Sequence, residues 1–146
     1  MSTVYEGGVI IYQKIFGLPK YLLIHRNNWE WGFPKGWLAK GANPKSLASF
    51  RSAAVLATKR QTNLDVQPGT DFVKTLRYQP RQNRASRLVK IMIARVKPHV
   101  IVTPPKNQVM DYGWFDFRTA YRTLYYDNQR NVFYDANQVI RKRLMG

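Results

Sequence analysis

The sequence predicts an α/β fold in which helices pack on a mixed β-sheet. Three observations predict it: short apolar runs open the chain, a segment with helical periodicity follows, and further strand-like runs lead to a last long helical segment. A chain of 146 residues is the size of one domain with one core. Residues 1–146 are therefore expected to form a single domain.

Two strands and a loop are expected at the start of the chain. Residues 9–12 and 21–24 are continuous apolar runs, and residues 17–19, Gly-Leu-Pro, are typical of a turn between two strands. Residues 29–41 are rich in glycine and aromatic side chains. We expect this segment to be a loop.

A helix is expected after that loop. Asn43 followed by Pro44 is typical of a helix N-terminus, because asparagine caps free amides and proline fits the first helical position. Asn63 tolerates the left-handed conformation that ends many helices. The apolar residues between these ends recur at steps of three and four and should form the inward face: Leu47, Phe50, Ala54 and Ala57.

The second half of the chain repeats the pattern of strands followed by a helix. The expected strands are residues 72–78, 88–96, 100–102 and 112–115, the last as an edge strand. A last helix is expected over residues 117–145, broken near residues 126–128. This order of elements indicates a mixed α/β sandwich.

Charge is the strongest functional signal in the composition. Lys and Arg number 24 against 8 Asp and Glu, which gives a formal net charge of +16 at pH 7. Such an excess costs self-repulsion, which a bound polyanion relieves. Nucleic acid is the commonest polyanionic partner, so we expect RNA or a ribonucleoprotein particle. The alternative is a basic surface without a specific partner.

Composition argues against several other classes of protein. The absence of cysteine excludes disulfides and thiolate zinc sites and favours a reducing compartment, so a cytoplasmic protein is expected, with the mitochondrion as the alternative. His25 and His99 have no metal-ligand neighbours at ligand spacing, so neither a metal nor a cofactor is expected. No long apolar run and no signal-like start occur, so no membrane partner is expected.

Residues 31–36, Trp-Gly-Phe-Pro-Lys-Gly, are the most specific motif in the chain. The motif and the segments around it resemble the Nudix hydrolases, in particular the branch that cleaves diadenosine tetraphosphate, over nearly the whole length. The resemblance implies a Nudix α/β/α sandwich with a mixed β-sheet. The other segments that carry it are residues 7–12, 21–26, 53–66, 112–115 and 126–130.

In that family, glutamates on one helix face hold Mg²⁺ against a diphosphate and help to activate water. Gly36 matches the first glycine of the family motif, and the motif's end aligns with Asn63-Leu64 if the segment is about six residues longer. An ungapped alignment puts Ala54 and Val55 at the paired glutamates instead. With the longer segment, Leu56 stands at the motif's arginine, and the positions of the family's acids are occupied by Ala42, Ala57, Arg60, Gln61 and, before the late strand, Gln108.

Neither alignment supplies an acidic side chain, because residues 31–64 contain no Asp or Glu. The same stretch contains several lysines and arginines. We therefore expect a degenerate Nudix domain without catalytic residues or metal ligands, a pseudoenzyme and not an enzyme.

Cations and aromatic rings within and after the motif are the candidate RNA-binding residues, because cations meet phosphates while flat rings stack on bases. By resemblance, Tyr78 and Phe133 are also candidates to stack on a nucleotide. The alternatives are packing for the rings and a solvated hairpin loop for the cations. The candidates are Lys35, Trp37, Lys40, Arg77, Tyr78, Arg81, Arg84, Arg87 and Lys90.

Three functional hypotheses remain open at this point. The leading one is RNA binding by a catalytically inactive Nudix-fold protein, as a component or factor of a ribosome or another ribonucleoprotein. The second is a sensor that binds a nucleotide such as a dinucleoside polyphosphate without cleaving it. The third is a residual Nudix hydrolase.

Overall fold

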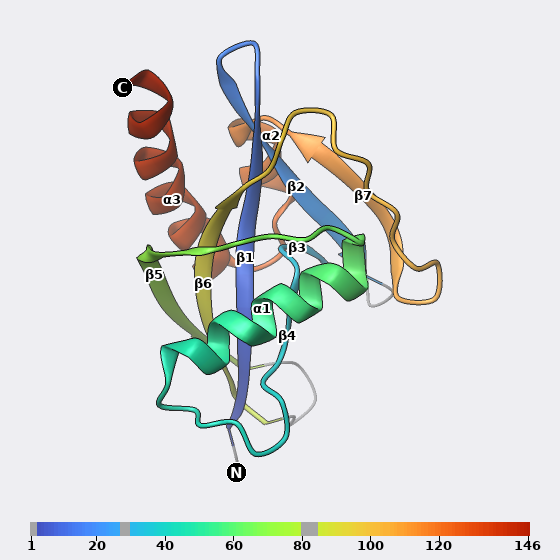
Figure 1. The fold of residues 1–146 in the computed structure, drawn as a ribbon, viewed down its shortest axis with the longest axis vertical. Helices are drawn as coiled ribbons and strands as arrows, with labels where there is room; N and C mark the ends of the chain where they lie inside the picture. Colours follow the sequence, from blue (N-terminus) through green and yellow to red (C-terminus); the bar gives the residue numbers. More distant parts are fainter. Residues whose placement is uncertain (1–2, 27–29, 80–84) are drawn as a thin grey trace.

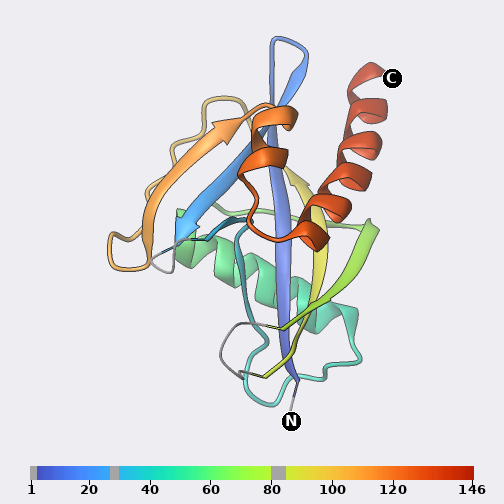
Figure 2. The same cartoon turned by 180° about the vertical axis from the view of Figure 1, so that it is seen from behind.

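The computed structural model describes residues 3–26, 30–79 and 85–146. In this part of the chain, a mixed β-sheet lies between one helix on its first face and two helices on its second (Figures 1 and 2). The α/β sandwich expected from the sequence is confirmed. The structure has the three-layer arrangement that the resemblance implied.

The described residues form a seven-stranded sheet in which β1 is central. Its path runs β3-β2-β1-β6-β5, while β4 pairs with β1 and β7 pairs with β2. The pairing of β1 with β6 is parallel and every other pairing is antiparallel. The strands are β1 (Val4–Ile15), β2 (Leu18–Arg26), β3 (Trp31–Gly32), β4 (Lys35–Trp37), β5 (Gly69–Tyr78), β6 (Arg87–Arg95) and β7 (Val109–Phe115).

Successive side chains of β1 belong alternately to two separate hydrophobic cores. Val9 and Ile11 point to one face of the sheet and pack with Phe50 of the first helix, while Ile10 and Tyr12 point to the other face. Successive side chains of a strand point to opposite faces, so a strand buried on both sides must be apolar at every position. The uninterrupted apolar run at residues 9–11 follows from this requirement.

The helices lie close to their expected positions. They are α1 (Leu47–Thr62), α2 (Phe117–Thr123) and α3 (Asp127–Met145). The expected break in the last helix is present between α2 and α3, and Asn63 ends α1 in the left-handed conformation at φ 62°. The expected N-terminus at Asn43 was wrong, since the N-cap is Ser46. No helix in the described ranges is long and apolar enough to cross a membrane.

Three local expectations are corrected by the structure. Residues 29–41 contain the short strands β3 and β4, because the backbone there pairs with β2 and β1. Residues 100–102 are not a strand. Thr103 donates a backbone hydrogen bond to Thr62 at the end of α1, and the following prolines offer no amide to a neighbouring strand. The first turn is tighter than expected and is made by Phe16 and Gly17, both at positive φ.

Gly7 sets how closely α1 approaches β1. A Cβ built on this residue would lie 2.0 Å from the carbonyl oxygen of Phe50 and 3.0 Å from the amide nitrogen of Ala54. Both atoms belong to the helix backbone and cannot swing aside as a side chain could. The absence of a side chain at Gly7 therefore permits the close contact between the first half of α1 and the sheet.

We predict that Gly7→Ala destabilises the fold strongly. Overpacking a close backbone contact costs about 3 kcal/mol, the upper end of the usual range, because the helix must shift as a body. Urea unfolding followed by circular dichroism measures this change. Gly32→Ala is the matched control, since a Cβ there meets nothing nearer than 3.5 Å. Equal stability of the two variants would show that α1 can move away without loss.

Candidate functional site

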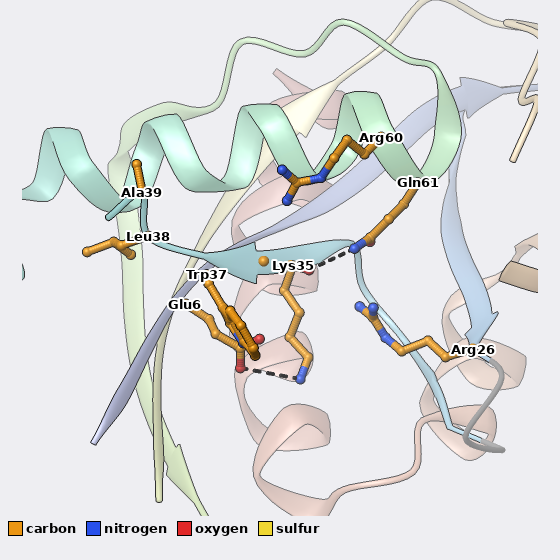
Figure 3. Close-up of a pocket in the computed structure, with 9 residues that line it drawn as sticks. Glu6, Arg26, Lys35, Trp37, Leu38, Ala39, Arg60 and Gln61 are labelled. Carbon is orange, nitrogen blue, oxygen red and sulfur yellow. Dashed lines mark hydrogen bonds and ion pairs between the residues drawn. The ribbon is translucent and has the colours of Figure 1, made fainter. Parts of the chain in front are cut away.

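A pocket opens between β4 and the C-terminal end of α1 (Figure 3). Its volume is about 420 Å³, and side chains from β1, β2, β4 and the helix converge on it. Most of the polar groups in its wall are cationic. The lining residues are Glu6, Arg26, Lys35, Gly36, Trp37, Leu38, Ala39, Arg60 and Gln61.

The close packing of α1 on β4 places Arg60 over the pocket. A Cβ on Gly36 would lie 2.8 Å from the Cβ of Ala57 and 3.1 Å from Nη2 of Arg60. The guanidinium therefore lies over bare backbone, and Figure 3 shows it reaching from the helix toward β4. No hydrogen bond or ion pair holds the Arg60 side chain to another described residue. It is an exposed cation that is available to a ligand.

Glu6 is the buried carboxylate at the base of the pocket, only 5% exposed. The hydroxyl of Tyr78 donates to its Oε1 at 3.0 Å, and Nζ of Lys35 lies 3.7 Å from the same oxygen. Nη1 of Arg87 lies 3.4 Å from Oε2. One carboxylate thus joins side chains from β1, β4, β5 and β6.

Lys35 is buried at 8% exposure and points into this network. Its ammonium group donates to the hydroxyl of Tyr78 and lies 4.6 Å from the centre of that ring. Burial lowers the pKa of Lys35 to about 8, and Glu6 offsets only part of the effect. Burial likewise lowers the pKa of Arg26, whose Nη2 donates to the carbonyl of Phe33 at 2.8 Å.

The tyrosines beside the network remain neutral donors. Burial, reinforced by Glu6, raises the pKa of Tyr78 far above its ordinary value. Burial and a hydrogen bond to Glu30 raise the pKa of Tyr126 in the same way, with the hydroxyl at 2.7 Å from Oε1. The rings of Tyr78 and Tyr126 pack at 4.9 Å, so the two networks are neighbours.

Gln61 completes the wall above Lys35. Its Nε2 donates to the carbonyl of Lys35 at 2.9 Å, which anchors the end of α1 to the start of β4 (Figure 3). Its Oε1 is buried and has no hydrogen-bond partner among the described residues. A buried acceptor without a partner is costly, so a hydroxyl or water donor would be favoured beside it.

The remaining residues predicted to bind RNA differ in their position, and Trp37 and Lys40 lie at or next to this pocket. Trp37 lines it with a ring that is 64% exposed, and Lys40 follows as an exposed side chain. Arg77 is exposed on β5. Lys90 is half-buried, donates to Thr75 at 3.0 Å and lies over the ring of Phe50, so part of its charge serves the fold.

Other predicted site residues have structural roles. Phe133 is fully buried and packs on Tyr21 and Phe33, so stacking on a ligand would require the core to open, and that expectation is corrected. Lys35 and Arg87 are engaged with Glu6, so neither is the exposed phosphate contact that the sequence suggested. Tyr78 is also committed to that carboxylate through its hydroxyl.

Some candidates fall outside the described residues, and some contributors were not foreseen. Arg81 and Arg84 lie in the segment 80–84, for which no structure is described. Arg26 and Glu6 were not predicted as site residues, although both line the pocket. One signal could have pointed to Glu6: it is one of only two glutamates in the chain.

The positions aligned with the family's acids are dispersed in the structure. Arg60 and Gln61 lie side by side at the pocket. Ala57 is fully buried and packs over Gly36, while Ala42 lies in the turn before α1 and Gln108 is exposed before β7. Only the first pair is therefore placed to face a ligand in this pocket.

Comparison with known proteins identifies the fold. No family model matches the chain, and no curated protein matches it in sequence. The structure is similar to that of Caenorhabditis elegans Ap4A hydrolase in a binary complex, with a TM-score of 0.81 and 20% identity over 94% of this chain and 97% of that one. The NUDIX domain of Shewanella oneidensis NrtR complexed with ADP ribose is similar at a TM-score of 0.71 and 13% identity, covering 96% and 90%.

These comparisons establish a Nudix α/β/α fold and correct one expectation. The structural neighbours are Nudix hydrolases, which are enzymes, and they contradict the prediction that this chain is not an enzyme. That prediction rested on the absence of Asp and Glu from residues 31–64. A shared fold at this level of identity does not transfer an activity or deny one.

The residues of the pocket do not fit the magnesium that Nudix hydrolases hold with glutamates. Magnesium prefers carboxylate oxygens and water. Helix α1 carries no carboxylate, and the described residues contain no cluster of three His, Cys, Asp or Glu side chains that could hold a metal. Glu6 is the one acid among the lining residues, and its oxygens already meet Tyr78, Lys35 and Arg87.

We predict that Lys35 makes the protein more stable as pH rises above 8. Its folded pKa of about 8 lies below its ordinary value of 10.5, so between these values the unfolded chain binds the extra proton. The free energy of unfolding must then increase with pH, by at most about 1.4 kcal/mol per pH unit. Tyr78 acts in the opposite direction, but only above its ordinary pKa of 10.0.

Urea unfolding at pH 7.5, 8.5 and 9.5 measures this dependence in the wild type and in Lys35→Met. The difference in stability between the two proteins should shift in favour of the wild type at each step. Parallel pH curves for the two proteins would show that Lys35 keeps an ordinary pKa.

Proposed function

We propose that this Nudix-fold chain binds RNA, as a component or factor of a ribosome or another ribonucleoprotein. The observation that carries the proposal is the exposed ring of Trp37 at a pocket whose charged side chains are mainly cationic. An exposed aromatic ring beside cations is the combination that single-stranded nucleic acid uses, because bases stack while phosphates meet positive charge.

The overall charge supports the same proposal. A net charge of +16 favours association with a polyanion, and the exposed Lys40 and Arg60 place part of that charge beside Trp37. Alignment with the family motif puts Arg60 and Gln61 where Nudix hydrolases have paired glutamates. In this alignment a cation and an amide replace two anions, so phosphate meets less repulsion here.

We predict that Trp37→Ala weakens binding to single-stranded RNA by about 1–3 kcal/mol, the usual value of one stacked base. The dependence of affinity on salt should hardly change, since no charge is lost. Fluorescence anisotropy with a labelled oligonucleotide measures both quantities. Tyr134→Ala is the matched control, because this ring is 50% exposed on α3, across the sheet from α1. An equal effect of both substitutions would rule out stacking at Trp37.

We predict the opposite signature for Lys40→Ala combined with Arg60→Ala. Each lost phosphate contact releases one fewer counterion, so the slope of log affinity against log salt should decrease by about 0.7 per contact on a single strand. Affinity should fall for all RNA sequences alike. Lys106→Ala, an exposed cation before β7, is the control. An unchanged slope in the double variant would remove this edge from the RNA-binding surface.

A second candidate function, hydrolysis of a phosphoanhydride in a nucleotide, is favoured by one observation. The two glutamates of the chain converge on the pocket, since Glu6 lines it and Glu30 acts on the charges of Arg26 and Lys35. Ap4A hydrolase is among the structural neighbours. Turnover of diadenosine tetraphosphate that is lost in Glu30→Gln and retained in Asp111→Asn would support hydrolysis. Saturable binding of that dinucleotide without turnover, and without RNA binding, would favour a nucleotide sensor.

A further inference from the structure

We propose that the pocket between β4 and α1 binds a pyrophosphate group directly through Arg60 and Arg26, with the buried charge of Lys35 behind them and without a divalent cation. The ligand is the diphosphate part of a nucleotide or of an RNA end that carries a 5′-diphosphate or 5′-triphosphate. This inference deepens the proposed function and rests on its premise that the ligand carries phosphate. It differs from the arrangement implied by the Nudix fold, in which metal ions lie between the protein and the phosphates.

The charges of the pocket favour an anion. Among the lining residues three cations, Arg26, Lys35 and Arg60, face one carboxylate, Glu6, an excess of two positive charges. Arg87 and Glu30 lie next to this group and leave the excess unchanged, since they add one charge of each sign. A phosphate that carries two negative charges would balance the set.

The same charges oppose a divalent cation. A metal ion in this pocket would add two positive charges beside side chains that are already crowded with their own sign. Burial lowers the pKa of both Arg26 and Lys35, and the neighbouring positive charges, Arg87 on both and Arg26 on Lys35, lower it further. An incoming phosphate relieves this repulsion, whereas a metal ion increases it.

The geometry supplies donors from two directions, with a buried positive charge between them. Arg60 extends from the last turn of α1 over Gly36 (Figure 3). Arg26 points into the pocket from the end of β2, and Lys35 lies at the start of β4 (Figure 3). Arg60 has no partner among the described residues, so its planar fork is free to bind two phosphate oxygens.

The experiment is calorimetric titration of the full chain with inorganic pyrophosphate at pH 7, once in EDTA and once in Mg²⁺. Saturable binding in EDTA is expected, and Mg²⁺ should weaken it because the ion neutralises the ligand. Arg60→Gln should reduce the affinity on the order of tenfold to a hundredfold, the usual effect of losing a charged hydrogen bond. Arg60→Lys should restore only part of the loss, because a point charge replaces a fork.

Lys59→Gln is the matched control. Lys59 is the residue before Arg60 on α1, is exposed, and pairs with Asp65 at 3.3 Å away from the lining residues. Its substitution removes the same charge from the same helix and should leave pyrophosphate affinity unchanged. Equal losses in Arg60→Gln and Lys59→Gln would overturn the proposal, because they would indicate a general charge effect.

RNA binding measured on the same samples separates this inference from the proposed function. Pyrophosphate binding in EDTA without RNA binding would support the pocket and reject the RNA proposal. RNA binding without saturable pyrophosphate binding would reject the pocket alone. Binding of pyrophosphate only in Mg²⁺ would also overturn the inference, since the metal would then be the phosphate ligand. Far-ultraviolet circular dichroism confirms that each variant is folded.

Discussion

The buried carboxylate of Glu6 organises the functional end of this molecule. It receives a hydrogen bond from Tyr78 and ion pairs from Lys35 and Arg87, which come from three different strands. A buried charge is tolerated only when it is paired and hydrogen-bonded, so the strands must keep the positions that supply these partners. The pocket wall is the outer side of this arrangement. Its shape and its charge therefore depend on one interaction.

The network also explains why the pocket is positive although it contains a carboxylate. One carboxylate, Glu6, cannot balance several cations at once. Arg26 and Lys35 therefore keep a net positive charge in a poorly hydrated environment. Burial then lowers the pKa of both cations, which shows that each is charged at a cost to the folded state. An anionic ligand would recover part of that cost as binding energy. The interior of the fold and the preference of the pocket for phosphate are thus linked.

The likeness to Ap4A hydrolase at 20% identity shows how little of the sequence the fold itself requires. The sheet requires apolar residues at β1 and its neighbours, and a core accepts many combinations of such residues if volume and pattern are kept. Close contacts are less tolerant, and Gly7 against the backbone of α1 is one of them. The polar residues of the pocket wall are not constrained in this way. They can diverge while the α/β/α layers persist.

The sequence alone determined the features that depend on near neighbours in the chain. The apolar run of β1, the helical spacing of α1 and the left-handed end at Asn63 are local patterns, and the elements followed from them. Tertiary structure decided the rest. β3 and β4 exist because β2 and β1 offer them hydrogen bonds. Phe133 became core because α3 packs it against Tyr21 and Phe33. Glu6, Lys35 and Tyr78 met because β1, β4 and β5 converge. Burial and pKa arise from such long-range packing, so local patterns cannot specify them.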